Sequence, residues 1–394
     1  MSQSSKGRFD LKGKNAEKFV HDLAVKTFLV DWCYLNPKLP NGKELCDLLV
    51  VYDDTVVIWQ VKDLQVDEAG RYRDREVAKN LRQLSGARRQ LVSLKTAVEL
   101  ENPRRRKEFL DAASIKEIYL ISVLLGEGED AFSFLIRFRD YNVHVFNKDF
   151  TQLVLGELDT VSDFVRYLRA KEILKRDKHV IVVGGEEELL AWYLMNDRSF
   201  DRFKEANAVL LDQGSWQQFR LSQKYRNKKE EDQISYGWDD IINRVHEASP
   251  EYEVVARELA RPDRFERRVL AKAYYDAYVL ADKDKTHNLF RRTCALNGVT
   301  YCFLFADDTR PREFRKAMLE SMCYIARGKF KSNRKVIGIA TEKRASSICS
   351  YDFALLNMPE WTEQNEREMA KLQGRSRILV SPEISVLNEE EYPA

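Results

Sequence analysis

The chain has 394 residues, of which 44% are hydrophobic and 32% are charged, and its 65 basic and 63 acidic residues nearly cancel. This length predicts two domains, and the hydrophobic share is sufficient for ordinary buried cores. With a net charge of only +2, the global charge favours neither nucleic acid nor any other class of charged partner. The six cysteines form no CxxC pair and have no histidine at zinc-ligand spacing, which argues against a structural zinc site.

Nothing in the sequence indicates export or membrane insertion. No run approaches the roughly 20 apolar residues that a membrane-spanning helix requires. The first residues, MSQSSKGRFDLKGKN, lack the apolar stretch of a signal peptide. We therefore expect a cytoplasmic protein that does not enter a membrane.

The first half of the chain alternates helix and strand patterns. Apolar residues recur at three-to-four spacing over residues 15–29, which predicts a helix. Two β-branched runs follow and are joined by Asp53-Asp54, which predicts a hairpin. The predicted elements are strands at 45–52 and 55–61, a helix at 75–99, strands at 115–125 and 141–146, and a helix at 161–175 capped by Asp159 or Thr160. This order predicts an α/β domain over residues 1–178, with a mixed sheet flanked by helices.

The second half predicts a further α/β domain. Residues 179–250 are expected to be a connector, with a strand at 179–183, a helix at 186–195 and a charged linker near 225–233. The predicted elements beyond it are helices at 238–247, 251–280, 312–326 and 360–372, and strands at 299–305, 336–340 and 351–356. Residues 251–394 would then form a C-terminal α/β domain for regulation or assembly. Acidic residues near its strand ends leave two interpretations open, an inactive catalytic fold or a sensor of another molecule.

The predicted hairpin brings polar side chains together at one end. If Asp53-Asp54 is a two-residue turn, Tyr52 pairs with Thr55 and Asp47 faces Gln60. Lys62 projects from the same face as Gln60, because side chains alternate along a strand. By the same alternation Glu44 falls on the opposite face and is not expected at this site.

These side chains suit metal-assisted hydrolysis of a phosphodiester. Mg²⁺ takes hard oxygen ligands and keeps several waters, one of which can become the attacking hydroxide. A lysine at this position can hold that water or offset the charge that builds on the scissile phosphate. Glu17, on the helix before the hairpin, is a candidate for a third oxygen ligand.

At this point the residues match a family. The segments ELCDLLVV and IWQVKD resemble motifs two and three of the PD-(D/E)XK nucleases, and GKNAEKF resembles the helix that often supplies their extra glutamate. The resemblance implies a restriction-endonuclease-like fold in the N-terminal half and Mg²⁺ as cofactor, with Mn²⁺ able to substitute. It implies these roles: Asp47 as principal metal ligand, Gln60 as second ligand position, Lys62 as catalytic lysine, Glu17 as accessory ligand and the backbone carbonyl of Val61 as a further ligand. Gln60 departs from the family name, because an amide oxygen ligates without adding negative charge; a QxK variant does occur among restriction-type members.

The predicted helix at 75–99 has an apolar stripe and a polar one. Residues 71–107 hold twelve basic side chains and four acidic ones, a local excess that attracts polyanions. In the nucleases that the chain resembles, the helix after motif three approaches the phosphate backbone. The resulting candidate nucleic-acid contacts are Lys79, Arg82, Gln83 and Arg89.

The sequence therefore predicts a Mg²⁺-dependent endonuclease that hydrolyses phosphodiester bonds of DNA. Fold-level analogy suggests a role in bacterial (antiviral) defence against foreign DNA. Two alternatives stay open: a catalytically weakened nuclease fold that binds or senses nucleic acid, for which Gln60 is the motive, and a ribonuclease. A homodimer or higher homo-oligomer is expected if both strands of a duplex are cut.

Overall fold

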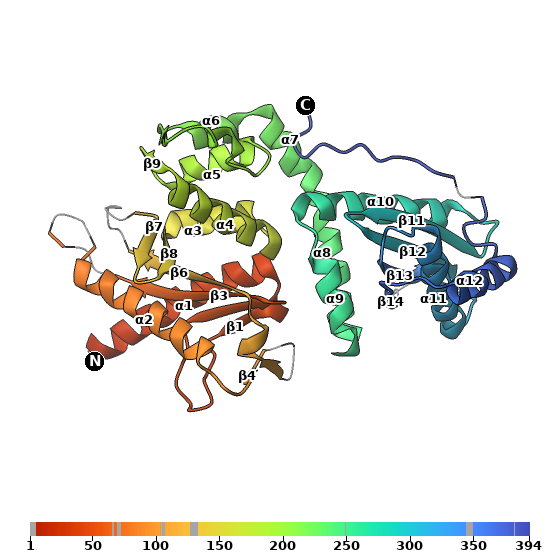
Figure 1. Cartoon of the computed structure of the whole chain (residues 1–394), viewed down its shortest axis with the longest axis horizontal. Coiled ribbons are helices and arrows are strands. Elements are labelled where there is room, and N and C mark those ends of the chain that lie inside the picture. Colours follow the sequence, from red (N-terminus) through yellow and green to blue (C-terminus); the bar gives the residue numbers. More distant parts are fainter. Residues whose placement is uncertain are drawn as a thin grey trace. The chain divides into compact units, whose positions relative to one another are not determined.

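The computed structural model describes residues 5–64, 67–68, 72–102, 104, 107–126, 133–248, 250–343, 350–381 and 383–394. The chain divides into two compact units, Met1–Ser222 and Gln223–Ala394 (Figure 1). Each unit contains a sheet flanked by helices. The predicted α/β class, with a mixed sheet in the first half and a second α/β domain, is confirmed.

A six-stranded mixed sheet forms the centre of the first unit. In spatial order its strands are β1 (Cys33–Leu35), β2 (Leu48–Tyr52), β3 (Thr55–Asp63), β6 (Glu117–Leu125), β8 (Tyr141–Asn147) and β7 (Leu135–Phe138). β3, β6 and β8 run parallel, whereas β1, β2 and β7 pair antiparallel with their neighbours. The short strands β1 and β7 were not predicted.

Helices cover both faces of this sheet. They are α1 (Ser5–Phe28), α2 (Asp74–Val92), α3 (Lys148–Glu157) and α4 (Val161–Asp177). Leu81 and Leu84 of α2 share one apolar core with Ile58 of β3. On the opposite face Trp59 stacks on Phe164 of α4. Successive residues of β3 therefore point to different helical layers, as alternation along a strand requires.

The predicted helix at 75–99 ends earlier than expected. α2 stops at Val92, and Val98–Leu100 forms β4, which pairs with β5 (Glu108–Leu110). Val98 and Leu100 are buried while Glu99 between them is exposed, which is the period of a strand. The predicted end of the helix was therefore wrong. By contrast, α4 begins as predicted, with Thr160 as N-cap accepting a hydrogen bond from the backbone of Asp163.

Residues after α4 belong to the first unit. They form β9 (His179–Val182), α5 (Glu186–Met195), β10 (Ala208–Leu211) and α6 (Ser215–Leu221), with β9 and β10 parallel. The buried Lys171 of α4 donates to Glu186 of α5 at 2.5 Å, and Tyr167 donates to the same carboxylate at 2.8 Å. These contacts join α5 to α4, and the first compact unit runs to Ser222, past the predicted domain end at residue 178.

The second unit begins where the charged linker was predicted, near residues 225–233. These residues form α7 (Gln223–Glu231) and the 3₁₀ turn η4 (Asp232–Ser235). The elements that follow are α8 (Tyr236–Ala248), α9 (Glu253–Ala260), α10 (Arg264–Lys283), β11 (Leu289–Leu296), β12 (Val299–Asp307), α11 (Arg312–Lys329), β13 (Lys335–Lys343), β14 (Tyr351–Asn357) and α12 (Glu363–Ser376). The helix predicted over 251–280 is divided at Pro262, and Asp263 caps the second part.

The sheet of the second unit has the order β11-β12-β13-β14. β12 and β13 are parallel, and the outer strands are antiparallel to them. Trp238 of α8 and Tyr274 of α10 pack against Phe303 on one face, whereas Leu319 of α11 packs with Leu304 on the other. This unit also has helices on both faces of its sheet.

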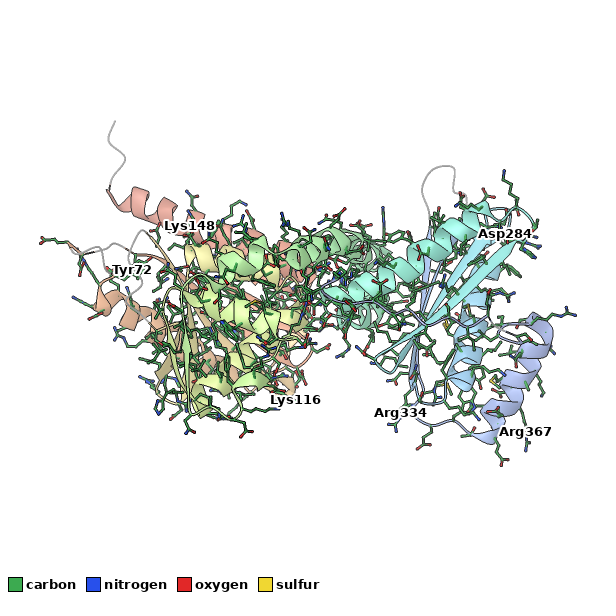
Figure 2. All side chains as sticks on the ribbon, turned by 90° about the horizontal axis from the view of Figure 1, so that it is seen from above. Tyr72, Lys116, Lys148, Asp284, Arg334 and Arg367 are labelled. Carbon is green, nitrogen blue, oxygen red and sulfur yellow. The ribbon has the colours of Figure 1, made fainter. Side chains whose placement is uncertain are left out.

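The two ends of the first sheet are marked by labelled residues. Lys116 directly precedes β6, and Tyr72 donates to the carbonyl of Gly126 just after β6. Figure 2 shows these two side chains well apart, at opposite ends of the sheet. Because β3 is parallel to β6, Lys62 near the end of β3 lies at the end that Tyr72 marks.

Five of the six cysteines lie within the described residues. Cys33, Cys46, Cys294, Cys302 and Cys323 are free thiols, and Cys349 lies outside the described residues. Within the part of the chain that the structure describes, no helix is long and apolar enough to cross a membrane. Three arginines of the basic segment, Arg71, Arg105 and Arg106, also lie outside the described residues.

Candidate active site

The hairpin has the predicted register. Tyr52 pairs with Thr55, Val50 with Val57 and Leu48 with Trp59. The turn places Asp53 in the left-handed region, at φ 52°, which aspartate tolerates better than most residues. Continuing this register by one residue brings Asp47 opposite Gln60, at the edge of the strand.

Asp47, Gln60 and Lys62 meet at the end of β3. The amide Nε2 of Gln60 donates to Oδ1 of Asp47 at 2.5 Å, and the backbone N–H of Val61 donates to Oδ2 at 2.6 Å. Lys62 Nζ lies 3.7 Å from Asp47 Oδ2. Asp47 and Gln60 are 3% and 5% exposed, whereas the Lys62 side chain is 30% exposed. The lysine therefore lies between a buried carboxylate and solvent.

Burial and neighbouring charge compete at Asp47. The pKa of this carboxyl is raised from its ordinary value of 3.8 to about 6, first by burial and also by the negative charges of Glu17 and Glu44. The ammonium group of Lys62 and the Val61 N–H act in the opposite direction. A second positive charge at this place would favour the ionised form of Asp47.

Two glutamates lie within electrostatic reach of Asp47. Glu17, predicted as the accessory ligand, accepts a hydrogen bond from Asn36 Nδ2 at 3.3 Å. Glu44, which was not expected here, has a pKa raised first by burial and next by Glu17, and its side chain hydrogen bonds with Asp47. The prediction for Glu44 was wrong because strand alternation does not extend back to it: β2 begins only at Leu48.

A local turn places Glu44 on the same side as Asp47. Residues 37–45 double back, with the Leu45 N–H donating to Pro37 and an isolated antiparallel bridge between Lys38 and Glu44. Pro37, Pro40 and Gly42 are the signal in the sequence that could have indicated this turn. The backbone N–H of Asn36 also donates to the carbonyl of Asp47 at 3.0 Å. This turn holds the ends of β1 and β2 together at the site.

These residues suit a hard divalent cation in their chemistry. Carboxylate oxygens from Asp47, Glu17 and Glu44 and an amide oxygen from Gln60 are the ligand types that Mg²⁺ prefers. Among the described side chains, no three from the histidine, cysteine, aspartate and glutamate classes are arranged as a ready metal-binding group. Gln60 is turned with its amide nitrogen toward Asp47, so ligation through its oxygen would require the amide to turn over.

A buried hydrogen bond links α2 to the strand next to Gln60. Gln60 pairs in register with Ser122 of β6, and the Oγ of Ser122 accepts from Asn80 Nδ2 of α2 at 2.8 Å. Asn80 and Ser122 are both 0% exposed. This bond joins α2 to the strand beside Gln60, and the sequence pattern of α2 had not indicated it.

The predicted nucleic-acid contacts lie on the outer face of α2. All four of these side chains are exposed: Lys79, Arg82, Gln83 and Arg89. The neighbouring Arg88 instead packs over the ring of Tyr141, 4.0 Å from its centroid. The separation of α2 into a packed stripe and an exposed stripe is therefore as predicted, while contact with nucleic acid stays a prediction.

The second unit has the same order of elements around its sheet, a hairpin, then a helix and then a parallel strand, but different residues at the positions of the site. β11 and β12 pair antiparallel, and α11 leads to β13, which is parallel to β12. Leu304 and Ala306 hold the positions in β12 that Gln60 and Lys62 hold in the equally long β3. Arg291 lies opposite Leu304, where Asp47 would be expected. The second unit therefore lacks the Asp47, Gln60 and Lys62 set at these positions.

No family model, curated protein or solved structure matches this chain.

Proposed function

We propose that the first unit is a Mg²⁺-dependent endonuclease of the PD-(D/E)XK type that cleaves DNA. The observation that carries the proposal is the convergence of Asp47, Gln60 and Lys62 at one strand end, beside Glu17 and Glu44. The order of elements that the resemblance implies, a helix with Glu17, the hairpin, and then a basic helix, supports it.

Each residue has a distinct role in this proposal. Asp47 is the principal ligand, and Gln60 contributes an amide oxygen after its amide has turned. Glu17 and Glu44 supply the negative charge that Gln60 lacks, with the Val61 carbonyl as a further oxygen. When bound, Mg²⁺ lowers the pKa of water so that hydroxide is accessible near neutral pH. Lys62, which is part exposed, is positioned to stabilise negative charge on a phosphate that approaches from solvent.

Plasmid cleavage tests this proposal directly. The purified chain is incubated with supercoiled DNA and separately with RNA, in Mg²⁺, Mn²⁺ or EDTA. We expect cleavage of DNA with either metal and none in EDTA, and a loss of at least about 100-fold in Asp47→Ala and in Lys62→Ala. Lys116→Ala, an exposed lysine at the opposite end of the sheet, is the matched control and should cleave normally. Cleavage that persists equally in all three variants would exclude this site.

One observation favours a second candidate, a nucleic-acid-binding or sensing protein with weakened catalysis. Gln60 donates to Asp47 and so already satisfies part of the buried carboxylate without any cation. In that case the chain would bind DNA or RNA equally well in EDTA and in Mg²⁺ and would cleave neither. Filter binding beside the cleavage assay separates the two candidates, and cleavage of RNA alone would identify a ribonuclease.

The proposed cellular setting is defence against foreign DNA, with a homodimer as the active form because a duplex cut needs two such sites. Sedimentation of the chain with and without a DNA duplex tests the assembly. A monomer that cuts both strands would contradict it.

A further inference from the structure

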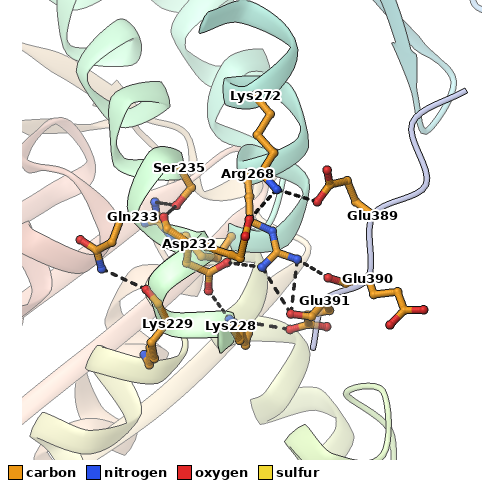
Figure 3. Close-up of polar contacts among 12 residues, drawn as sticks. Lys228, Lys229, Asp232, Gln233, Ser235, Arg268, Lys272, Glu389, Glu390 and Glu391 are labelled. Carbon is orange, nitrogen blue, oxygen red and sulfur yellow. Dashed lines mark hydrogen bonds and ion pairs between the residues drawn. The ribbon is translucent and has the colours of Figure 1, made fainter. Parts of the chain in front are cut away.

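An acidic segment at residues 389–394 docks on the helices of the second unit. Arg268 of α10, which is 0% exposed, donates to the backbone carbonyls of Glu390 and Glu391 (Figure 3). Lys272 of α10 donates to the carboxylate of Glu389 at 2.9 Å. One arginine therefore binds the backbone of the segment, while a lysine binds one of its side chains.

The first helix of the unit holds the other end of this segment. Asn227 Nδ2 on α7 donates to the carbonyls of Pro393 at 3.3 Å and Ala394 at 2.7 Å. Lys228 lies 4.0 Å from a carboxylate oxygen of Glu391 and 5.7 Å from the ring centre of Tyr392. The acidic segment thus bridges α7 and α10.

α7 buries little of its own surface. Six of its nine residues are charged, and Lys228 is the buried one. A helix of this length is marginal without packing. Part of its support comes from residues more than 160 positions away, which a linker-like sequence does not indicate.

The surface under the segment is not a simple anion site. Asp232 accepts from Arg268 at 3.2 Å and pairs with Lys228, and Glu231 pairs with Lys272 at 2.5 Å. These carboxylates would repel a phosphate. A peptide suits the mixture better, because Arg268 binds main-chain carbonyls and the lysines bind acidic side chains.

The segment is joined to the rest of the unit by an exposed stretch. Ile378 is buried beside α12, and its carbonyl accepts from Gln373. Residues 383–388 are all exposed, including Ile384 at 84% and Val386 at 81%. Side chains this exposed add little packing, so the contacts of residues 389–394 are what hold the segment down.

We propose that α7, η4 and α10 form a recognition site for an acidic, extended peptide, and that residues 389–394 occupy it in the chain itself as a releasable latch on α7. Release exposes Arg268 and Lys272 to a competing acidic peptide. It also removes the contacts of Asn227 and Lys228 with the segment, which makes unfolding of α7 easier.

Hydrogen exchange of the full chain tests the latch. Glu389→Lys with Glu391→Lys reverses both charges that face the lysines. Glu390→Lys is the matched control, because the Glu390 carboxylate points away from the site and only its carbonyl binds Arg268 (Figure 3). We expect amide exchange in residues 223–231 to accelerate about fivefold to tenfold in the double variant and to stay unchanged in the control. Asn227→Ala removes two further contacts with the segment, together with the bond that its Oδ1 accepts from Gln223 within α7, and touches no buried charge; it should act in the same direction. Equal exchange in wild type, double variant and Asn227→Ala would overturn the proposal.

A labelled peptide with the sequence of residues 387–394, LNEEEYPA, tests recognition. It should bind the double variant at least about tenfold more tightly than wild type, where the tethered segment competes at high effective concentration. The charge-reversed peptide LNKKKYPA should not bind. Failure of LNEEEYPA to bind the double variant would overturn the recognition site. A short DNA strand that competes with the peptide at equal affinity would show instead a phosphate site.

Discussion

At Asp47, burial and neighbouring charge set a dependence of stability on pH. Because the pKa is raised from 3.8 to about 6, the native state holds this proton more tightly than the unfolded chain does. The free energy of unfolding therefore falls as pH rises through the window between the two values, and the full cost of up to about 3 kcal/mol applies above it.

Urea unfolding in EDTA measures this cost. Between pH 5 and pH 8, wild type should lose about 1–2 kcal/mol more stability than Asp47→Asn, which cannot ionise. Asp47→Asn also loses one acceptor oxygen for the Val61 or Gln60 donor, which lowers its stability at every pH. The two proteins are therefore compared by how their free energies of unfolding change with pH, and not by their absolute values. Parallel slopes would mean that Asp47 is not the titrating group.

Replacing Gln60 by glutamate should have opposite effects on stability without and with a bound metal. Gln60→Glu removes the donor to Asp47 and adds another acid beside it, so without metal we expect a loss of about 1–3 kcal/mol. In Mg²⁺ the added carboxylate should strengthen binding, so the variant should gain more thermal stability from the metal than wild type does. Melting curves in EDTA and in Mg²⁺ measure both effects.

Gln90→Glu, on the exposed end of α2, is the matched control for this change. It should shift neither curve. A Gln60→Glu protein that Mg²⁺ stabilises no more than it stabilises wild type would argue against a cation at this place.

The residues of the site were predictable to different degrees. Asp47, Gln60 and Lys62 follow from the turn at Asp53-Asp54 and strand alternation, both of which are local rules. Glu44 does not follow from them, because the turn at residues 37–45 displaces it from the strand. Asn80 could not be identified at all, since its partner Ser122 is on a strand 42 residues away.

At the scale of elements, α2 connects the site to its proposed substrate. Lys79→Glu with Arg82→Glu should weaken DNA binding at every sequence and lower the salt dependence by about one unit per lost phosphate contact. Fluorescence anisotropy at several salt concentrations measures this slope. Lys116→Glu, the same change at the opposite end of the sheet, should leave the slope unchanged (Figure 2). Equal effects of both changes would indicate general charge rather than contact by α2.

The bond between Asn80 and Ser122 joins α2 to β6 and is testable by a double-mutant cycle. Asn80→Ala should cost about 1–3 kcal/mol, because it leaves a buried hydroxyl without its donor. Asn80→Ala with Ser122→Ala should cost less than the sum of the single changes, by about 1 kcal/mol. Strict additivity in denaturant unfolding would show that the bond does not couple the two elements.

Elements defined by their own periodicity were predicted well, and elements that depend on distant partners were not. α5 has the predicted bounds because its apolar run and preceding glycines are local signals. β1 has three residues, too few for a pattern, and exists because β2 pairs with it. α7 has the composition of a linker, and its contacts with Pro393 and Glu391 join it to residues more than 160 positions away.

At the scale of the whole molecule, a buried ion pair joins residues beyond 178 to the first unit. The order of predicted helices and strands indicated an end near residue 178, after the last helix of the predicted sheet domain. Lys171 on that helix is 0% exposed and pairs with Glu186, which is 3% exposed in its side chain. A chain that ended at residue 178 would leave this ammonium group buried without its carboxylate.

Expression of two fragments tests this boundary. Residues 1–222 should fold cooperatively, whereas residues 1–178 should lose about 3–5 kcal/mol from the broken buried pair, together with the apolar contacts of Leu174 with Leu189 and Val209. Thermal unfolding followed by circular dichroism measures both. In residues 1–222, Glu186→Ala should reproduce much of the loss, because it leaves Lys171 unpaired while keeping β9 to α6. If residues 1–178 melt as cooperatively and at the same temperature as residues 1–222, the segment from β9 to α6 is not part of the folding unit that positions Asp47 and Lys62.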